Sequence, residues 1–253
     1  MRVYADAVVA ADGIGSALRA QLFPGHPGLR RTGRLDLRGM LPVPAGVDTA
    51  GLPAGNFIDR RTGSEFGLYP VGTDRLYWFT DSALTGEAPS VDQARRLVLE
   101  LTADWHPTVP ALIQATSPGS IYVDAITCLA RPLPSFVLGR VALIGDAAHG
   151  MPPDLGQGAS QGFEDAAALS RHLAGAGPGD VVERFRRYDA DRRPRANRML
   201  RLAVRMSRFT SQTGGIAWLR DALIRGVPDR LVIARLASMY GQPEAVPAHT
   251  TTA

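Results

Sequence analysis

The residues whose types and spacing best suit chemistry lie between positions 139 and 165. Val141 to Ile144 is a short, almost uninterrupted apolar run, which is typical of a strand buried on both faces of a sheet. Gly145 and Asp146 end this run. They place a carboxylate at the carboxyl end of the predicted strand, which is where open α/β sheets bind ligands.

A loop and a helix follow this acid. The loop is rich in proline and glycine, and its marked positions are Pro152, Pro153, Gly156 and Gly158. The helical spacing of Ala166, Leu169 and Leu173 then predicts a helix that stops near Gly175. Glycine lets the backbone approach a ligand closely, and the free N–H groups of a helix N-terminus favour negative charge. The order of strand, acid, glycine loop and helix therefore predicts a site for a polar, anionic ligand.

The same stretch allows other interpretations. Gly158 to Gly162 matches Gly-x-Ser-x-Gly, the nucleophile elbow of α/β-hydrolases, but that elbow needs a strand directly before its serine, and here a loop precedes Ser160. A plain proline and glycine loop without a ligand is the other alternative. The 5 histidines are scattered without the spacing of a metal site, so no metal is expected. His149 is expected to order the loop.

A second acid and glycine close an earlier predicted strand. Tyr4 to Ala11 reads as that strand, and it leads through Asp12 and Gly13 into a helix predicted at about Ser16 to Leu22. Asp-Gly alone is above all a turn signal, so a bare turn is the alternative at this position. Its pairing with the later stretch, in this order, favours the functional interpretation.

Together the two stretches resemble the FAD-binding motifs of class A FAD-dependent monooxygenases, the aromatic hydroxylases of the para-hydroxybenzoate hydroxylase and salicylate hydroxylase type. The resemblance implies that Asp146 hydrogen-bonds the ribityl chain of FAD. It also implies that backbone N–H groups around Gly158, Ala159 and Ser160 face the pyrimidine edge of the flavin. A helix N-terminus at that place stabilises the negative charge of reduced flavin.

The resemblance implies further cofactor contacts. Asp12 and Gly13 would lie between the pyrophosphate of FAD and the path of the nicotinamide cofactor, and Pro153 and Gly156 belong to the expected cofactor-binding loop. One departure from the family is Ser160, where asparagine is common. A contact made by the backbone survives that change.

The family's first fingerprint, Gly-x-Gly-x-x-Gly on a βαβ unit, does not occur in these 253 residues. A βαβ unit needs roughly 30 residues, which is more than the stretch before Asp12 provides. We therefore expect the chain to correspond to the C-terminal two-thirds of such an enzyme, without the ADP site. The alternative function is a truncated or degenerate homologue without catalysis. An uncovered sheet edge would also favour self-association.

The predicted fold is α/β, with an incomplete Rossmann-like FAD-binding domain, an inserted and mainly antiparallel substrate domain, and C-terminal helices. The predicted boundaries are 1–32 and 128–178 for the partial FAD-binding domain, 33–127 for the substrate domain, 179–240 for the helices and 241–253 for a disordered tail. Strands are expected at 33–43, 56–60, 64–69 and 75–80, with a loop at 46–55 after the first and tight turns between the last three. Ser90 with Gln93 predicts a capped helix, and Pro194 is predicted to kink or break the last long helix.

The inserted domain would supply the substrate pocket. Tyr69 and Trp78 are predicted pocket walls, and ordinary core packing is the alternative for each. The resemblance implies a monooxygenase that uses FAD, NAD(P)H and O2 to hydroxylate a small aromatic or similarly electron-rich molecule. Family members differ in the groups that activate the substrate, so no catalytic residue is assigned.

Composition narrows the class of protein further. A single cysteine, Cys128, allows no internal disulfide and suits a reducing compartment, so a cytoplasmic location is expected. No apolar run of about 18 residues occurs, so no membrane span is expected. All 28 basic residues are arginine, and the net charge is +4. The arginines between Arg184 and Arg208 are interpreted as a solvated helix face, so no nucleic-acid partner is expected.

Overall fold

The computed structural model describes residues 4–45, 54–84, 87–225, 227–228 and 230–231. The chain divides into two compact units, Met1–Ser211 and Gln212–Ala253. The described part of the second unit holds one helix, α7 (Gly214–Arg225). The tail 241–253, for which disorder is predicted, lies outside the described residues. Most of the loop predicted at 46–55 also lies outside the residues that the structure describes. All that follows concerns the first unit.

A small sheet forms one half of the first unit. Its strands are β1 (Val8–Ala10), β8 (Val141–Leu143) and β7 (Val137–Leu138), in the order β1-β8-β7. β1 runs parallel to β8, so the two predicted strands that end in an acid lie side by side and point the same way. Parallel pairing brings their carboxyl ends to one edge, which is why two motifs 134 residues apart meet there.

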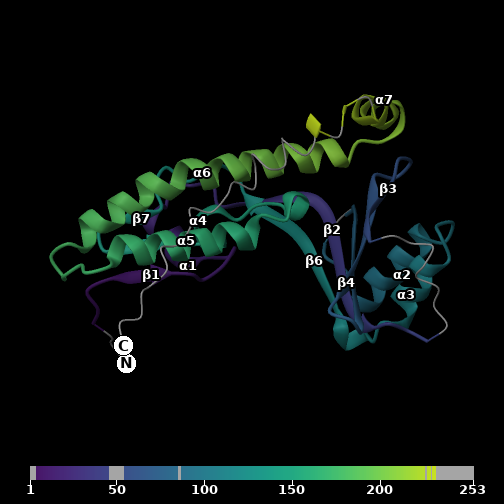
Figure 1. The fold of residues 1–253 in the computed structure, drawn as a ribbon, viewed down its shortest axis with the longest axis horizontal. Coiled ribbons are helices and arrows are strands. Elements are labelled where there is room, and N and C mark those ends of the chain that lie inside the picture. The colour runs from purple at the N-terminus through teal and green to yellow at the C-terminus, as the bar shows by residue number, and fades with distance from the viewer. Residues whose placement is uncertain (1–3, 46–53, 85–86, 226, 229, 232–253) are drawn as a thin grey trace. The chain divides into compact units, whose positions relative to one another are not determined.

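Helices follow both of these strands. They are α1 (Ala17–Leu22), α4 (Asp146–His149), the 3-10 turn η2 (Pro153–Leu155), α5 (Gly158–Leu173) and α6 (Val181–Thr210). α5 and α6 lie side by side (Figure 1). Their apolar faces join the small sheet in one core, whose largest buried members are Leu133, Phe136, Leu143, Phe185 and Tyr188.

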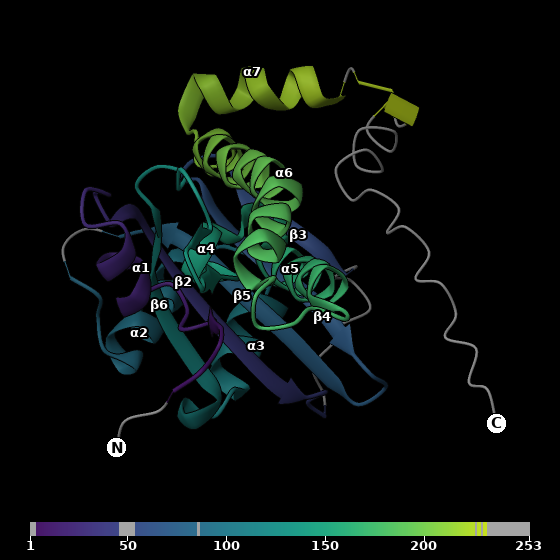
Figure 2. The same ribbon diagram turned by 90° about the vertical axis from the view of Figure 1, so that its left-hand side faces the viewer.

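A five-stranded antiparallel sheet forms the other half. Its strands, in spatial order, are β3 (Gly55–Asp59), β4 (Ser64–Val71), β5 (Arg75–Ala83), β2 (Leu29–Pro42) and β6 (Ile121–Leu129). The long strands β2, β4, β5 and β6 are seen together in Figure 2. The connection to β6 contains α2 (Val91–Leu101), α3 (Thr108–Ala115) and the 3-10 turn η1 (Pro118–Ser120).

One face of this sheet is apolar and packs on α2 and α3. Because strand side chains alternate between faces, every second residue of β2 and β5 enters this core, including Leu35, Leu37, Leu76 and Trp78. The capping box predicted at the start of α2 is confirmed, since the side chain of Ser90 accepts a hydrogen bond from the backbone N–H of Gln93. The opposite face of the sheet is left for polar residues.

Pro194 was predicted to kink or break the helix, and a break is wrong, because α6 continues through it to Thr210. A proline inside a helix removes one hydrogen bond and crowds the carbonyl four residues earlier, here that of Ala190. Both Pro194 and Ala190 are exposed, so water can reach that carbonyl. The following turn is held by the buried residues Ala196 and Leu200.

The predicted α/β class, with its antiparallel insertion and C-terminal helices, is confirmed. The domain boundaries given above stay predictions. In the part of the chain that the structure describes, none of the helices combines the length and the apolar character needed to cross a membrane.

Candidate functional site

A cavity of about 670 Å³ lies where the carboxyl ends of β1 and β8 face the polar side of the five-stranded sheet. Six of the eight residues predicted to bind the cofactor line it, namely Gly13, Asp146, Pro153, Gly156, Gly158 and Ala159. Asp12 and Ser160 do not. The sheet contributes Asp36, Arg38 and the segment from Asp124 to Thr127. The structure therefore gathers the two sequence motifs around one space. The inserted sheet forms a wall of it, as expected, but through residues that were not among the predicted site residues.

Asp146 is fixed at the rim of the cavity by a sharp turn. Gly145 has φ 58°, a conformation that costs little only for glycine, and it stops β8 so that Asp146 begins α4. The buried guanidinium of Arg19 donates hydrogen bonds to the carbonyl oxygens of Asp146 at 3.3 Å and Ala147 at 3.2 Å. Arg19 also donates to the carbonyl oxygen of Ile14, so one side chain from α1 ties the two motifs together.

Asp12 does not line the cavity but supports the turn that leads into α1. Its Oδ2 accepts a hydrogen bond from the backbone N–H of Leu18 at 3.3 Å, while Ser16 caps α1. Burial raises the pKa of Asp12, but hydrogen bonds from Ser16 and from the backbone of Leu18 outweigh it and lower the pKa below its ordinary value. The carboxylate thus stays ionised and orders the turn at Gly13, which itself lines the cavity.

The glycine loop presents backbone to the cavity. Gly156 has φ 61° and ends η2, and α5 then begins at Gly158 without a side-chain cap on its first N–H groups. Added Cβ atoms at Gly13, Gly145, Gly156 and Gly158 would meet no atom within 4 Å, so these backbones border open space that a larger residue would fill. Uncapped N–H groups beside such a space suit an anionic, hydroxyl-bearing ligand, and the residues present fit the flavin nucleotide that the sequence resemblance implies.

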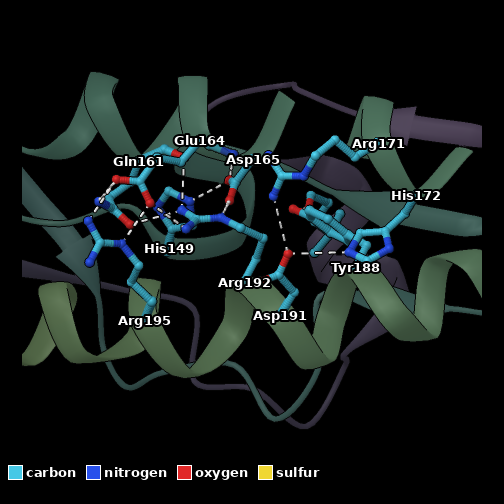
Figure 3. Close-up of polar contacts among 12 residues, drawn as sticks. His149, Gln161, Glu164, Asp165, Arg171, His172, Tyr188, Asp191, Arg192 and Arg195 are labelled. Atoms are coloured by element: carbon cyan, nitrogen blue, oxygen red, sulfur yellow. Dashed lines mark hydrogen bonds and ion pairs between the residues drawn. The ribbon is translucent and has the colours of Figure 1, made fainter. Parts of the chain in front are cut away.

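A buried ionic network lies behind this loop (Figure 3). Asp165 on α5 is fully buried, and its Oδ2 is 2.6 Å from Nε2 of His149 and accepts the backbone N–H of Gly145 at 2.9 Å. Its Oδ1 accepts from Nε of Arg192 on α6 at 2.8 Å. Both oxygens are satisfied, and the network clamps α4, α5 and α6 around the turn that carries Asp146. His149 orders the loop, as its position in the sequence led us to expect.

The network extends toward the surface through Glu164. Arg192 and Arg195 both donate to this carboxylate, and Arg192 also donates to the carbonyl and side-chain oxygens of Gln161. Burial raises the pKa of Glu164, but its bonds to Arg195 and the charge of Arg192 lower it overall. The solvated-face interpretation of the α6 arginines is therefore wrong for Arg192, which is 4% exposed. Its spacing from the other arginines carried no signal of burial.

Four carboxylates cross the polar face of the five-stranded sheet, and sequence reasoning missed them. Directly paired positions join Glu65 to Asp81, Asp81 to Asp36 and Asp36 to Asp124. We call these four residues the carboxylate row. Two of its members, Asp36 and Asp124, line the cavity. In the sequence, Asp36 and Glu65 lie inside predicted strands and Asp81 directly follows one, but the meaning of these acids depends on the register between the strands.

The two predicted pocket walls lie elsewhere. Trp78 is fully buried on the apolar face, where its Nε1–H donates to Oγ1 of Thr116 at 2.8 Å, so its position contradicts the expected pocket wall. Tyr69 is paired with Tyr77 on the polar face, and its hydroxyl donates to the side chain of Asn56. Tyr69 does not line the cavity, and its role in substrate binding stays a prediction. Side chains alternate between the two faces of β5, and this alternation places Trp78 on the apolar face, away from the cavity.

The hydrolase interpretation loses its geometric basis. Ser160 lies in the first turn of α5 and follows η2 and Gln157, not a strand. His172, on the same helix, is engaged with Asp191 at 3.2 Å. A nucleophile elbow requires a serine held on a strained turn directly after a strand.

Comparison with known proteins gives a consistent result. A family model described as "FAD binding domain" matches residues 1–203. The Aurachin C monooxygenase/isomerase of Stigmatella aurantiaca is 34% identical over 91% of this chain and 58% of its own length. The 6-hydroxynicotinate 3-monooxygenase of Bordetella bronchiseptica is 35% identical over 79% of this chain and 52% of its own length. The chain thus spans little more than half the length of these relatives.

Solved structures agree with the sequence matches. Klebsiella pneumoniae HpxO, in complex with FAD and uric acid, superposes with a TM-score of 0.79 and 30% identity, covering 92% of this chain and 59% of that one. A salicylate hydroxylase substrate complex superposes with a TM-score of 0.68 at 24% identity, which shows a shared fold.

Proposed function

The chain belongs to the FAD-binding domain family of the class A flavoprotein monooxygenases, and on that premise we propose that it works as a cytoplasmic, FAD-dependent hydroxylase of a small aromatic or similarly electron-rich molecule. NAD(P)H would be the reductant and O2 the second substrate. One observation carries the proposal: Asp146, the glycine loop and the uncapped start of α5 border the same cavity.

Each part of the chain would have a defined task. The carboxylate of Asp146 would accept a hydrogen bond from a ribityl hydroxyl, and the N–H groups of Gly158 and Ala159 would favour negative charge on the flavin ring. When bound, FAD supplies the redox chemistry and the activation of O2. The chain itself would orient both partners, because the polar sheet face and the loop line the same cavity.

The direct test is the substitution Asp146→Ala. Loss of a hydrogen bond to a charged group should weaken FAD binding by about 1.5–3 kcal/mol, measured by titrating FAD and following flavin fluorescence. Asp191→Ala removes an exposed carboxylate that pairs with Arg171 and His172 of α5, and it should leave the affinity unchanged. Equal FAD affinity of Asp146→Ala and the unchanged chain would contradict the assignment.

The alternative is a non-catalytic relative of these enzymes. The two functions differ in NAD(P)H oxidation measured with added FAD. A rate above that of free FAD, lowered by Asp146→Ala, would support the hydroxylase, and a background rate despite bound FAD would support the alternative.

Self-association of the chain is a further part of the proposal. In the described residues β1 pairs only with β8, so its other edge is open, and Val8 and Val9 are about 40% exposed. An open edge with apolar side chains favours the addition of another strand. Size-exclusion chromatography with light scattering should therefore give a mass above 27.0 kDa, and a strictly monomeric chain would contradict this part.

A further inference from the structure

The carboxylate row holds more negative than positive charge. Its four members face two guanidinium groups on the same sheet face: Arg34 pairs with Asp81 at 2.7 Å, and Arg38 pairs with Asp36 at 2.9 Å and with Asp124. Like charges directly opposite one another in a sheet are destabilising. An arrangement of this kind persists only if something in its surroundings compensates for it.

Asp36 is the member for which compensation is incomplete. It is 4% exposed, lies between Asp81 and Asp124 in the register, and lines the cavity. Its Oδ2 forms an ion pair with Nε of Arg38, an atom that is itself buried without a hydrogen-bond partner among the described residues. Its Oδ1 is buried as well, and it has neither an ion pair nor a hydrogen bond there. A buried acceptor without a partner is destabilising, so a ligand that donates a hydrogen bond to Oδ1 would gain binding free energy there.

The protonation equilibrium of the row agrees with the unpaired oxygen of Asp36. Burial raises the pKa of Asp36 to about 7, with Arg38 opposing the rise and the charges of Asp81 and Asp124 adding to it. Burial likewise raises the pKa of Glu65 to about 7, and the charge of Asp81 adds to it. Burial also raises the pKa of Asp81 to about 6, although the charge of Arg34 opposes the rise.

We propose that Asp36 determines the specificity of the cavity, and that it selects a planar ligand presenting N–H donors or a cationic nitrogen over a ligand presenting a carboxylate. An anionic ligand would add a further negative charge beside the row, and Arg38 is already shared between two carboxylates. A ligand with N–H groups supplies what Oδ1 of Asp36 lacks. The inference rests on the proposed function in one respect: the selected ligand would be the substrate of the hydroxylase.

A metal ion is a poorer occupant than an N–H donor. In the described part of the chain, no three side chains of histidine, cysteine, aspartate or glutamate are arranged to hold one. The members of the row follow one another across four strands instead of converging on a point, since directly opposite strand positions are about 5 Å apart.

The test uses two probes with the same ring and opposite charge, benzamidine and benzoate. Each is titrated into the 253-residue chain, with and without FAD, and binding is followed by ligand-observed NMR. Benzamidine should bind at least tenfold more tightly than benzoate, and Asp36→Asn should reduce this ratio to below threefold. Equal binding of the two probes to the unchanged chain would overturn the proposal.

Asp124→Asn is the matched control, because it removes the same charge from the same cavity wall. The side chain of Asp124 is 58% exposed, so water screens it, and the variant should keep most of the preference for benzamidine. If both variants lost the preference equally, the general charge of the wall and not Asp36 would be responsible, and the assignment would be wrong.

Two further measurements separate the possible failures. Circular dichroism shows whether Asp36→Asn is folded, and the affinity of the unchanged chain for benzamidine should rise from pH 6 to pH 8 as Asp36 ionises. Arg38, Asp81, Asp124 and Tyr77 also face this carboxyl, so the pH dependence must disappear in Asp36→Asn to be assigned to it. FAD binding is measured in a separate titration, followed by flavin fluorescence. A chain that prefers benzamidine without binding FAD would contradict the proposed function alone. A chain that binds FAD without preferring benzamidine would contradict the specificity of Asp36.

Discussion

The molecule buries carboxylates in two regions, and it treats them in opposite ways. Behind the glycine loop, both oxygens of Asp165 are bonded, to His149 and the backbone of Gly145 on one side and to Arg192 on the other. On the sheet face, Asp36 has one oxygen on Arg38 and one without a partner among the described residues. Both residues are at most 4% exposed, so the difference is one of partners and not of burial.

The two regions therefore have different roles: the network around Asp165 supports the fold, and Asp36 is available to bind a ligand. A satisfied ionic network has one favourable geometry, so it holds the elements that carry Asp146 in fixed positions. A carboxyl with an unpaired oxygen can still form a hydrogen bond to a ligand, and this adds to the binding free energy. The carboxyl of Asp36 also titrates in the neutral pH range. The first region is therefore expected to control stability, and the second to control ligand choice.

The largest expected effect comes from breaking the satisfied network. Asp165→Asn removes the fully buried carboxylate that pairs with Arg192 and His149, which should lower the free energy of unfolding by about 3–5 kcal/mol. Urea unfolding followed by circular dichroism measures the loss. Asp191→Asn, whose carboxylate is 45% exposed and pairs with His172 and Arg171, should cost less than about 1 kcal/mol. Equal losses in the two variants would show that Asp165 is not a special support.

The second effect has the opposite sign. Because the pKa of Asp36 is raised from 3.8 to about 7 in the folded chain, its contribution to stability is fully present below about pH 4 and is lost as pH rises through 7. Asp36→Asn removes this loss, so the variant should be more stable than the unchanged chain by on the order of 2 kcal/mol at pH 8. The gain should shrink toward pH 5 in the same unfolding assay. A variant that is less stable at pH 8 would place Asp36 with the satisfied carboxylates.

The smallest effect is expected at the exposed end of the row. Asp124 pairs with Arg38, but its side chain is 58% exposed, so Asp124→Asn should change the free energy of unfolding by less than about 0.5 kcal/mol at any pH between 5 and 8. Matched unfolding curves at both ends of this range test the expectation. A change comparable to that of Asp36→Asn would mean that charge alone, without burial, governs the row.

The candidate cofactor site is the part of the molecule that the sequence indicated best. Asp146, Gly156 and Gly158 lie within 13 consecutive residues, so their chemistry, the strand before them and the helix after them are all local properties. The strands of the insertion were also predicted closely, since tight turns separate short apolar segments. Contact of these residues with FAD stays a prediction.

Residues far apart in the sequence were beyond such reasoning. Arg192 resembles its exposed neighbours in composition, and only the packing of α6 on α5 buries it against Asp165. Pro194 predicted a kink or a break because a proline inside a helix loses a hydrogen bond to its own turn, which is a local effect. The core contacts that keep α6 continuous involve residues far away in the sequence.

By itself, the sequence determined the two motifs, the order of the elements and the two-residue alternation of the strands, because each depends on neighbours along the chain. The tertiary structure decided which face of the sheet meets the cavity, and so placed Trp78 in the core and Asp36 in the wall. It also decided the register that aligns Glu65, Asp81, Asp36 and Asp124. A shift of one residue in any of these strands would move its acid to the other face, and that register is set by the packing of the whole sheet.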